Sequence, residues 1–152
     1  MHSAAETMPP PAAAGHAIWN PAAAACWSIV FTPAFGAYLV MRNWQALGED
    51  ARARAARKGW LFSLGLLSLE LLSSALNSRL NSESNFMPWI GVAWLLVWSL
   101  TAALPQARAV RARLGPDYPR RQWDPVLFAA VIAGTGYVLL RALFTFMFVA
   151  LT

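Results

Sequence analysis

The sequence is short of the residues on which most enzymes and metal sites depend. Its two histidines, His2 and His16, lie close to the start of the chain, and Cys26 is the only cysteine. The remaining sequence therefore holds no Ser/His pair, no HExxH motif and no His-based metal site. A single thiol also excludes an intramolecular disulfide. We expect a protein without catalytic residues, metal ions or cofactors.

Charge is scarce as well. Only 12% of the 152 residues are charged, whereas 58% are hydrophobic and the mean hydropathy is +0.44. Such a chain has too little polar surface to cover a soluble globule. Four stretches are long and apolar enough to cross a bilayer, which takes about 20 residues; they span about 21–41, 59–76, 86–104 and 125–151. The predicted fold class is all-α: one membrane domain, 18–152, forming an integral membrane four-helix bundle.

The segment before the first stretch is different. Residues 1–17 are rich in alanine and proline and contain no lysine or arginine, which predicts a disordered tail. The missing positive charge also argues against a secretory signal peptide. Asn20-Pro21 and Asp124-Pro125 each place a short hydrogen-bond acceptor before a proline, a pattern typical of helix starts. We therefore expect helices to begin at these two points.

The basic residues are concentrated in the two connections that join the first span to the second and the third to the fourth. By the positive-inside rule both connections are cytoplasmic, so the chain is expected to begin and end outside. These bases are predicted to contact anionic lipid headgroups, unless they are solvated charges that only fix the topology. With no nucleic-acid motif present, the net charge of +5 does not predict nucleic-acid binding. The predicted lipid contacts are Arg52, Arg54, Arg57, Lys58, Arg108, Arg111, Arg113, Arg120 and Arg121.

Both basic connections also carry helical signals. Glu49 precedes Arg52 by three residues, and the charges run from acidic to basic, as a helix dipole favours. This segment is predicted to form either an amphipathic helix on the membrane surface or an extension of the second span. The other connection is predicted to form a helix that starts at Pro105 and stops at Gly115-Pro116.

Small residues and a proline mark places where helices could bend or approach closely. Pro33 removes a backbone hydrogen bond and should kink the first span, and Gly36 follows it. Ala129 with Ala133, and the adjacent Gly134, give the fourth span the small-residue spacing that lets two membrane helices pack tightly.

Glu70 and Arg141 are the ionisable residues expected inside spans. They lie eleven residues past Gly59 and sixteen past Pro125, or about 16 and 24 Å along parallel helices, so an arginine side chain could join them. The two could form an ion pair, which we favour because ionisable groups in spans usually find partners. Alternatively, Glu70 could be protonated while Arg141 reaches the headgroups, or Glu70 could titrate in a proton or ion pathway.

One stretch carries a family resemblance. Residues 31–48 follow the pattern aromatic-x-Pro-x-x-Gly-x-x-Leu and then Asn-aromatic-x-x-Leu-Gly, and Tyr118 to Arg121 with Trp123 adds a second short match. In these residues the chain resembles a group of small multi-spanning bacterial inner-membrane proteins of uncharacterised function. The resemblance covers about a third of the chain and implies a bacterial plasma membrane, but no activity. The matching residues of the first stretch are Phe31, Pro33, Gly36, Leu39, Asn43, Trp44, Leu47 and Gly48.

Three classes of function compete. We favour a non-enzymatic multi-pass membrane protein that acts through helix packing, as a homo-oligomer, an accessory subunit or a partner-binding protein of the immunity type. A small transporter or channel would need Glu70 to line a hydrated path. A lipid-acting enzyme is disfavoured by the missing catalytic groups.

Overall fold

Helices are the only extended regular elements of the described chain. The computed structural model describes residues 17–80 and 86–150, and an isolated β-bridge joins Ile18 to Arg120 within them. This confirms the all-α class. The predicted disordered tail, apart from Ala17, and the last residue of the fourth predicted span lie outside the described residues.

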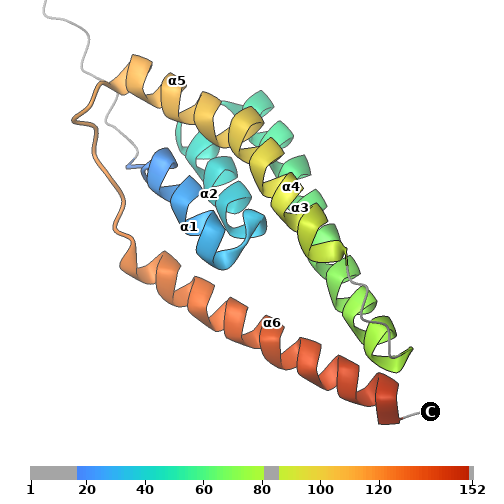
Figure 1. Cartoon of the computed structure of the whole chain (residues 1–152). Coiled ribbons are helices and arrows are strands. Elements are labelled where there is room, and N and C mark those ends of the chain that lie inside the picture. The colour runs from blue at the N-terminus through green and yellow to red at the C-terminus, as the bar shows by residue number, and fades with distance from the viewer. Residues whose placement is uncertain (1–16, 81–85, 151–152) are drawn as a thin grey trace, which may run out of the picture.

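The first apolar stretch is two helices rather than one span. Helix α1 (Pro21–Phe31) starts as predicted, with the Asn20 side chain accepting a hydrogen bond of 3.0 Å from the Ala22 N–H. Helix α2 (Pro33–Ala46) then runs back beside it, so that the pair forms a helical hairpin (Figure 1). The predicted single span over 21–41, kinked at Pro33, is therefore two helices that run back beside each other. At about 16 Å, α1 alone is too short to cross a bilayer.

The reversal takes place at Thr32. Its backbone has φ 137° and ψ 159°, a conformation that a β-branched residue rarely adopts. Pro33 follows as the first residue of α2, where its missing N–H leaves no helical bond unmade. We expected Pro33 to kink a continuous helix; instead the helix ends before the proline and a new one begins at it.

Two contacts hold the hairpin closed. Near its tip, Gly36 lies so close to α1 that an added Cβ would sit 1.8 Å from the Ser28 hydroxyl oxygen. At its base, the fully buried Asn43 side chain accepts from the Trp19 N–H at 3.0 Å and donates to the Trp19 carbonyl at 2.9 Å. The same amide donates to Gln106, which in turn donates to the Val40 carbonyl. The start of α1 and the end of α2 therefore lie at the same end of the molecule.

Three further helical segments are long. Helix α3 (Asp50–Arg79) joins the basic stretch to the second span in one helix of 30 residues, so that stretch is an extension of the span. Helix α4 (Met87–Trp98), the π-helical turn η1 (Ser99–Ala103) and α5 (Leu104–Leu114) follow one another as a 28-residue helix. Helix α6 (Asp124–Ala150) begins at the predicted point. Among the described residues, three helices instead of the predicted four are thus long and apolar enough to cross a membrane.

The π-helical turn has a cause in the sequence. Pro105 has no N–H to donate to the carbonyl four residues earlier, and its ring would clash with that carbonyl in a regular α-helix. The wider turn over Ser99–Ala103 lies directly before it and lets the helix continue into α5. The predicted helix start at Pro105 is therefore a change of helix type, whereas the predicted stop is correct, since α5 ends at Leu114.

The core lies where the hairpin meets α3 and the α4–α5 helix, and α6 runs along the outside (Figure 1). Its buried cluster consists of Ala37, Val40, Trp44, Ala53, Trp98 and Ala103. Elsewhere large hydrophobic side chains face outward, among them Trp89, Phe128 and Phe146 at 69–74% exposure. Outward-facing aromatic side chains of this size suit lipid rather than water.

The hairpin geometry predicts that replacing two different glycines by alanine changes the stability of the protein by different amounts. We expect Gly36→Ala to destabilise the protein by more than about 2 kcal/mol, because the new methyl group would overlap Ser28 and Trp98. Gly65→Ala should be neutral or slightly stabilising, because nothing lies within 4 Å of that Cβ and alanine favours a helix. Thermal unfolding in mild detergent measures both variants. Equal stability of the two would rule out the close approach.

Candidate functional site

The predicted ionisable residues meet on neighbouring helices. Glu70 of α3 and Arg141 of α6 lie 3.7 Å apart, measured between Oε1 and Nη1. Arg141 also donates through Nε to the Ser74 hydroxyl at 3.1 Å. One helical turn away, the Tyr137 hydroxyl donates to the Leu67 carbonyl at 3.1 Å. Together these contacts join α6 to α3 by polar bonds in an otherwise apolar region.

Sequence reasoning missed part of this cluster. Tyr137 was not singled out, although its four-residue spacing from Arg141 places both on one face of α6. The same spacing joins Glu70 and Ser74 on α3. The cluster is also open to the surroundings, with 29% of the Glu70 side chain and 43% of the Arg141 side chain exposed.

A small cavity lies between Glu70 and the hairpin tip. Its volume is about 100 Å³, and its lining includes Thr32, Pro33, Ser63 and Trp94 as well as Glu70. The Trp94 indole donates to the Ser63 hydroxyl at 2.8 Å, and that hydroxyl donates to the Gly59 carbonyl at 2.9 Å. The hairpin therefore ends against the carboxylate-bearing part of α3.

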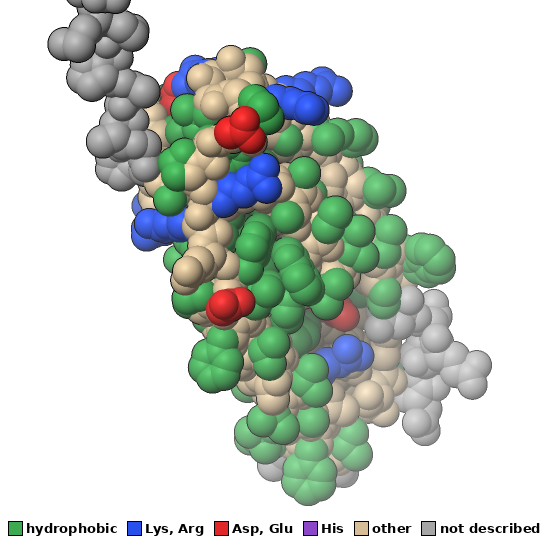
Figure 2. All heavy atoms as spheres, turned by 90° about the vertical axis from the view of Figure 1, so that its left-hand side faces the viewer, with side chains coloured by type: hydrophobic (Ala, Val, Ile, Leu, Met, Phe, Trp, Pro, Cys, Tyr) green, Lys and Arg blue, Asp and Glu red, His purple; other side chains and the backbone are tan. Residues whose placement is uncertain are grey.

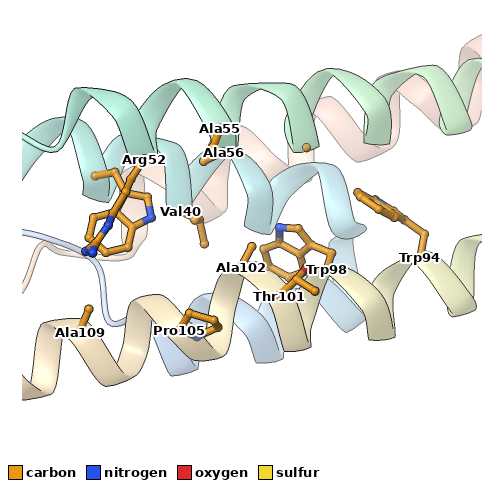
Figure 3. A pocket seen from close by; sticks show the side chains of 12 residues that line it. Val40, Arg52, Ala55, Ala56, Trp94, Trp98, Thr101, Ala102, Pro105 and Ala109 are labelled. Atoms are coloured by element: carbon orange, nitrogen blue, oxygen red, sulfur yellow. The ribbon is translucent and has the colours of Figure 1, made fainter.

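A larger cavity, which we call the tryptophan cavity, lies between α2, α3 and the α4–α5 helix (Figure 3). It has a volume of about 540 Å³, within the usual range for small-molecule sites. Trp94 lines both cavities, so the two meet at this residue. The sequence alone gives no sign of the tryptophan cavity, since the walls of this cavity come from three separate segments. Its lining is Val40, Trp44, Arg52, Ala55, Ala56, Gly59, Trp94, Trp98, Thr101, Ala102, Pro105 and Ala109.

The small residues of α6 are not packed as expected. Ala129, Ala133 and Gly134 line a third cavity, of about 390 Å³, between α6 and the hairpin. A Cβ added at Gly134 would meet nothing within 4 Å. Within the described chain these three residues make no tight helix contact, so their close packing stays a prediction, whereas Gly36 makes the close approach expected of it. The reason is geometric: the hairpin reverses at Thr32 and does not run beside α6 as a full span would.

The basic residues gather at one end, which we call the basic end. Figure 2 shows Lys and Arg side chains concentrated at the upper end of one face, with mostly hydrophobic side chains below. All nine residues predicted to contact lipid are exposed. Some also have partners within the chain: the Arg121 guanidinium lies 4.7 Å from the Trp19 ring centre, and that of Arg120 lies 5.5 Å from the Tyr118 ring centre.

Glu49 joins two helices at the basic end. It accepts a hydrogen bond from Arg113 of α5 and lies 3.9 Å from Arg52 of α3. The bond from Arg113 lowers the pKa of the Glu49 carboxyl; desolvation opposes this, and the charges of Arg113 and Arg52 add to it. Because the folded pKa is depressed, this contact stabilises the fold above the ordinary value of 4.5 and is lost as the pH falls through the lowered value.

Comparison with protein-family models, with curated proteins and with solved structures finds no match to this chain.

The ion pair leads to a coupling experiment. We expect Glu70→Leu and Arg141→Leu each to destabilise the protein, because each leaves one charge unpaired. The double variant should recover part of the loss, with a coupling energy of at least about 0.5 kcal/mol. Unfolding in mixed detergent micelles measures all three.

Arg79 provides the control for this cycle, because it lies nine residues past Glu70, or about 14 Å along α3, at the C-terminal end of the helix. Glu70→Leu combined with Arg79→Leu should be additive. Additivity for Glu70 and Arg141 as well would mean that the 3.7 Å contact contributes nothing.

Proposed function

We propose that this chain is a multi-pass protein of a bacterial inner membrane with three spans and a hairpin that enters from the cytoplasmic side. Support comes from the three long apolar helices and from the exposed bases at one end, which the positive-inside rule assigns to the cytoplasm. The chain would then enter the hairpin from the cytoplasm and end outside. An N-terminus outside the cell requires a first span that crosses the membrane. Because a hairpin takes the place of that span, the positive-inside rule now puts the start of the hairpin on the cytoplasmic side.

In this orientation the charge pair lies deep in the bilayer. Glu70 is eleven residues past Gly59, or about 16 Å along α3, and the hydrocarbon core is about 30 Å thick. A charged residue at the centre of a span costs about 2.5–3.5 kcal/mol on insertion scales. Partial exposure of Glu70 and Arg141 to lipid is therefore unfavourable, and covering the pair with another helix would reduce the cost.

The proposed activity is non-enzymatic binding of a membrane-embedded helix at the face where α3 and α6 meet, with a second copy of this chain as the occupant. The partial exposure of the pair, 29% and 43%, is the observation that carries this proposal. Both charges lie at the same depth, so a two-fold axis along the membrane normal would bring Arg141 of each copy to Glu70 of the other. In such a symmetric dimer, each Glu70 and each Arg141 has one oppositely charged partner in its own chain and a second one in the other copy.

Cysteine cross-linking in native membranes tests this contact. After Cys26→Ser, Val138→Cys should form a disulfide-linked dimer, because position 138 is exposed on the flank of α6 beside Arg141. Leu139→Cys is the matched control: it is exposed to a similar extent, 65% against 63%, but faces away from the pair. Equal cross-linking at both positions would contradict the proposal, and a Val138→Cys adduct with a different protein would replace the second copy with another partner.

A second candidate function, transport, rests on a different observation: Glu70 also lines the small cavity at the hairpin tip. A titrating carboxylate at a broken helix is a feature of ion and proton pathways. We expect purified protein in liposomes to give no more proton or cation flux than empty liposomes. A flux that Glu70→Gln abolishes, while Ser68→Ala leaves it intact, would establish transport and displace the helix-binding proposal.

A further inference from the structure

The tryptophan cavity has an unusual balance of polar groups. Among the described residues that line it, Arg52 is the only charged one and none carries a carboxylate. Its walls are otherwise indole rings, apolar side chains and Thr101, whose hydroxyl donates to the Val97 carbonyl. A site with one cation and no anion favours a ligand that carries negative charge, and walls of this composition favour a ligand with an apolar body.

Arg52 is free to bind such a group. Its guanidinium lies 4.8 Å from the centre of the Trp44 ring, and its one acidic neighbour in the described chain is Glu49, at 3.9 Å from Nε. Glu49 is hydrogen-bonded more closely by Arg113, so its charge is already matched. The Arg52 side chain is 48% exposed, so a ligand can reach its terminal nitrogens from the mouth of the cavity.

Trp98 supplies a second polar group that has no partner. The residue is 2% exposed, and its indole N–H donates to no acceptor in the described part of the chain. The five-membered ring faces α3, because a Cβ at Gly59 would lie 4.0 Å from Trp98 Cδ1. A glycine at that position leaves room beside the ring. No fully buried side-chain nitrogen of the described chain lacks a partner, so the Trp98 N–H is accessible from the cavity, and an indole N–H usually finds a hydrogen-bond partner.

The two ends of the tryptophan cavity differ in polarity. Figure 3 shows Arg52 at one end, Trp98 in the middle and Trp94 at the other end, and the Trp44 ring lies beside Arg52. Arg52 lies on the basic part of α3, seven residues before Gly59, whereas Trp94 lies within the apolar part of α4. The charged end therefore faces the basic end of the molecule, and the tryptophan end points into the apolar region.

We infer that the tryptophan cavity binds an amphipathic anion: an acidic headgroup at Arg52, with the rest of the molecule extending past Trp98 and an alkyl chain reaching Trp94. The headgroup is a carboxylate or a phosphate, and the molecule is either a free single-chain amphiphile or an anionic lipid from the surrounding bilayer. This inference does not depend on the proposed contact at Glu70 and Arg141, because the two sites share no residue.

A brominated dodecanoate tests the inference, because bromine quenches tryptophan emission on contact. The full chain in nanodiscs of zwitterionic lipid should show a saturable quenching component above the linear one that comes from partition into lipid. A brominated dodecyltrimethylammonium, with the same chain and a positive headgroup, should show only the linear component. Each methylene removed from the dodecanoate should weaken the saturable component by about fourfold.

Matched variants locate the site. Arg52→Gln should weaken binding by at least about tenfold through loss of a charge-assisted bond, whereas Arg54→Gln, an exposed base two residues away, should not. Gly59→Leu should remove the saturable component by filling the cavity, whereas Gly65→Leu points into open space and should retain it. Absence of a saturable component, equal binding of the cationic probe, or full binding by Arg52→Gln would each overturn the inference.

Lipid composition separates the two sources of ligand. In nanodiscs that contain an anionic phospholipid, competition with dodecanoate would identify the bilayer lipid as the occupant. Unchanged affinity would identify a free amphiphile. Both results support an amphipathic anion as the ligand.

Discussion

The hydrogen bonds of Asn43 determine how the rest of the structure is arranged. One buried amide binds both backbone groups of Trp19 and the side chain of Gln106, so it ties the start of α1, the end of α2 and α5 together. A buried amide that loses a partner costs about 1–3 kcal/mol, so these bonds strongly favour the closed hairpin. With both of its ends fixed at one level, the hairpin reaches only part of the way along α3.

The partial depth of the hairpin explains where the cavities lie. Beyond the tip at Thr32, no first span fills the space beside Glu70, which leaves the small cavity there. Beside α6, the small residues face a gap for the same reason. On the other side, Thr101 and Ala102 of the π-helical turn before Pro105 line the tryptophan cavity.

The sequence was enough to predict the helices but not the hairpin. Hydropathy identified the apolar segments, Asn20-Pro21 marked a true helix start, and the depths of Glu70 and Arg141 predicted residues that lie 3.7 Å apart. Pro33 predicts a kink in one helix, but a proline can equally begin a new helix after a chain reversal, and the sequence does not distinguish the two. Asn43 was a usable signal: a polar residue close after an apolar stretch needs partners, and these lie in segments remote in sequence. The cavities depend on such remote contacts, which no local pattern encodes.

The same remoteness has a consequence for biosynthesis. The hairpin is bound by residues that follow it at long range: Asn43 bonds a residue 63 positions later, and Trp19 bonds one 103 positions later. A ribosome therefore releases the hairpin long before the residues that secure it exist. Contacts between distant parts of a chain form late because closing long loops costs entropy. The hairpin can therefore close on its own contacts as soon as it is made, whereas its bonds to Gln106 and Gln122 form only after most of the chain has been synthesised.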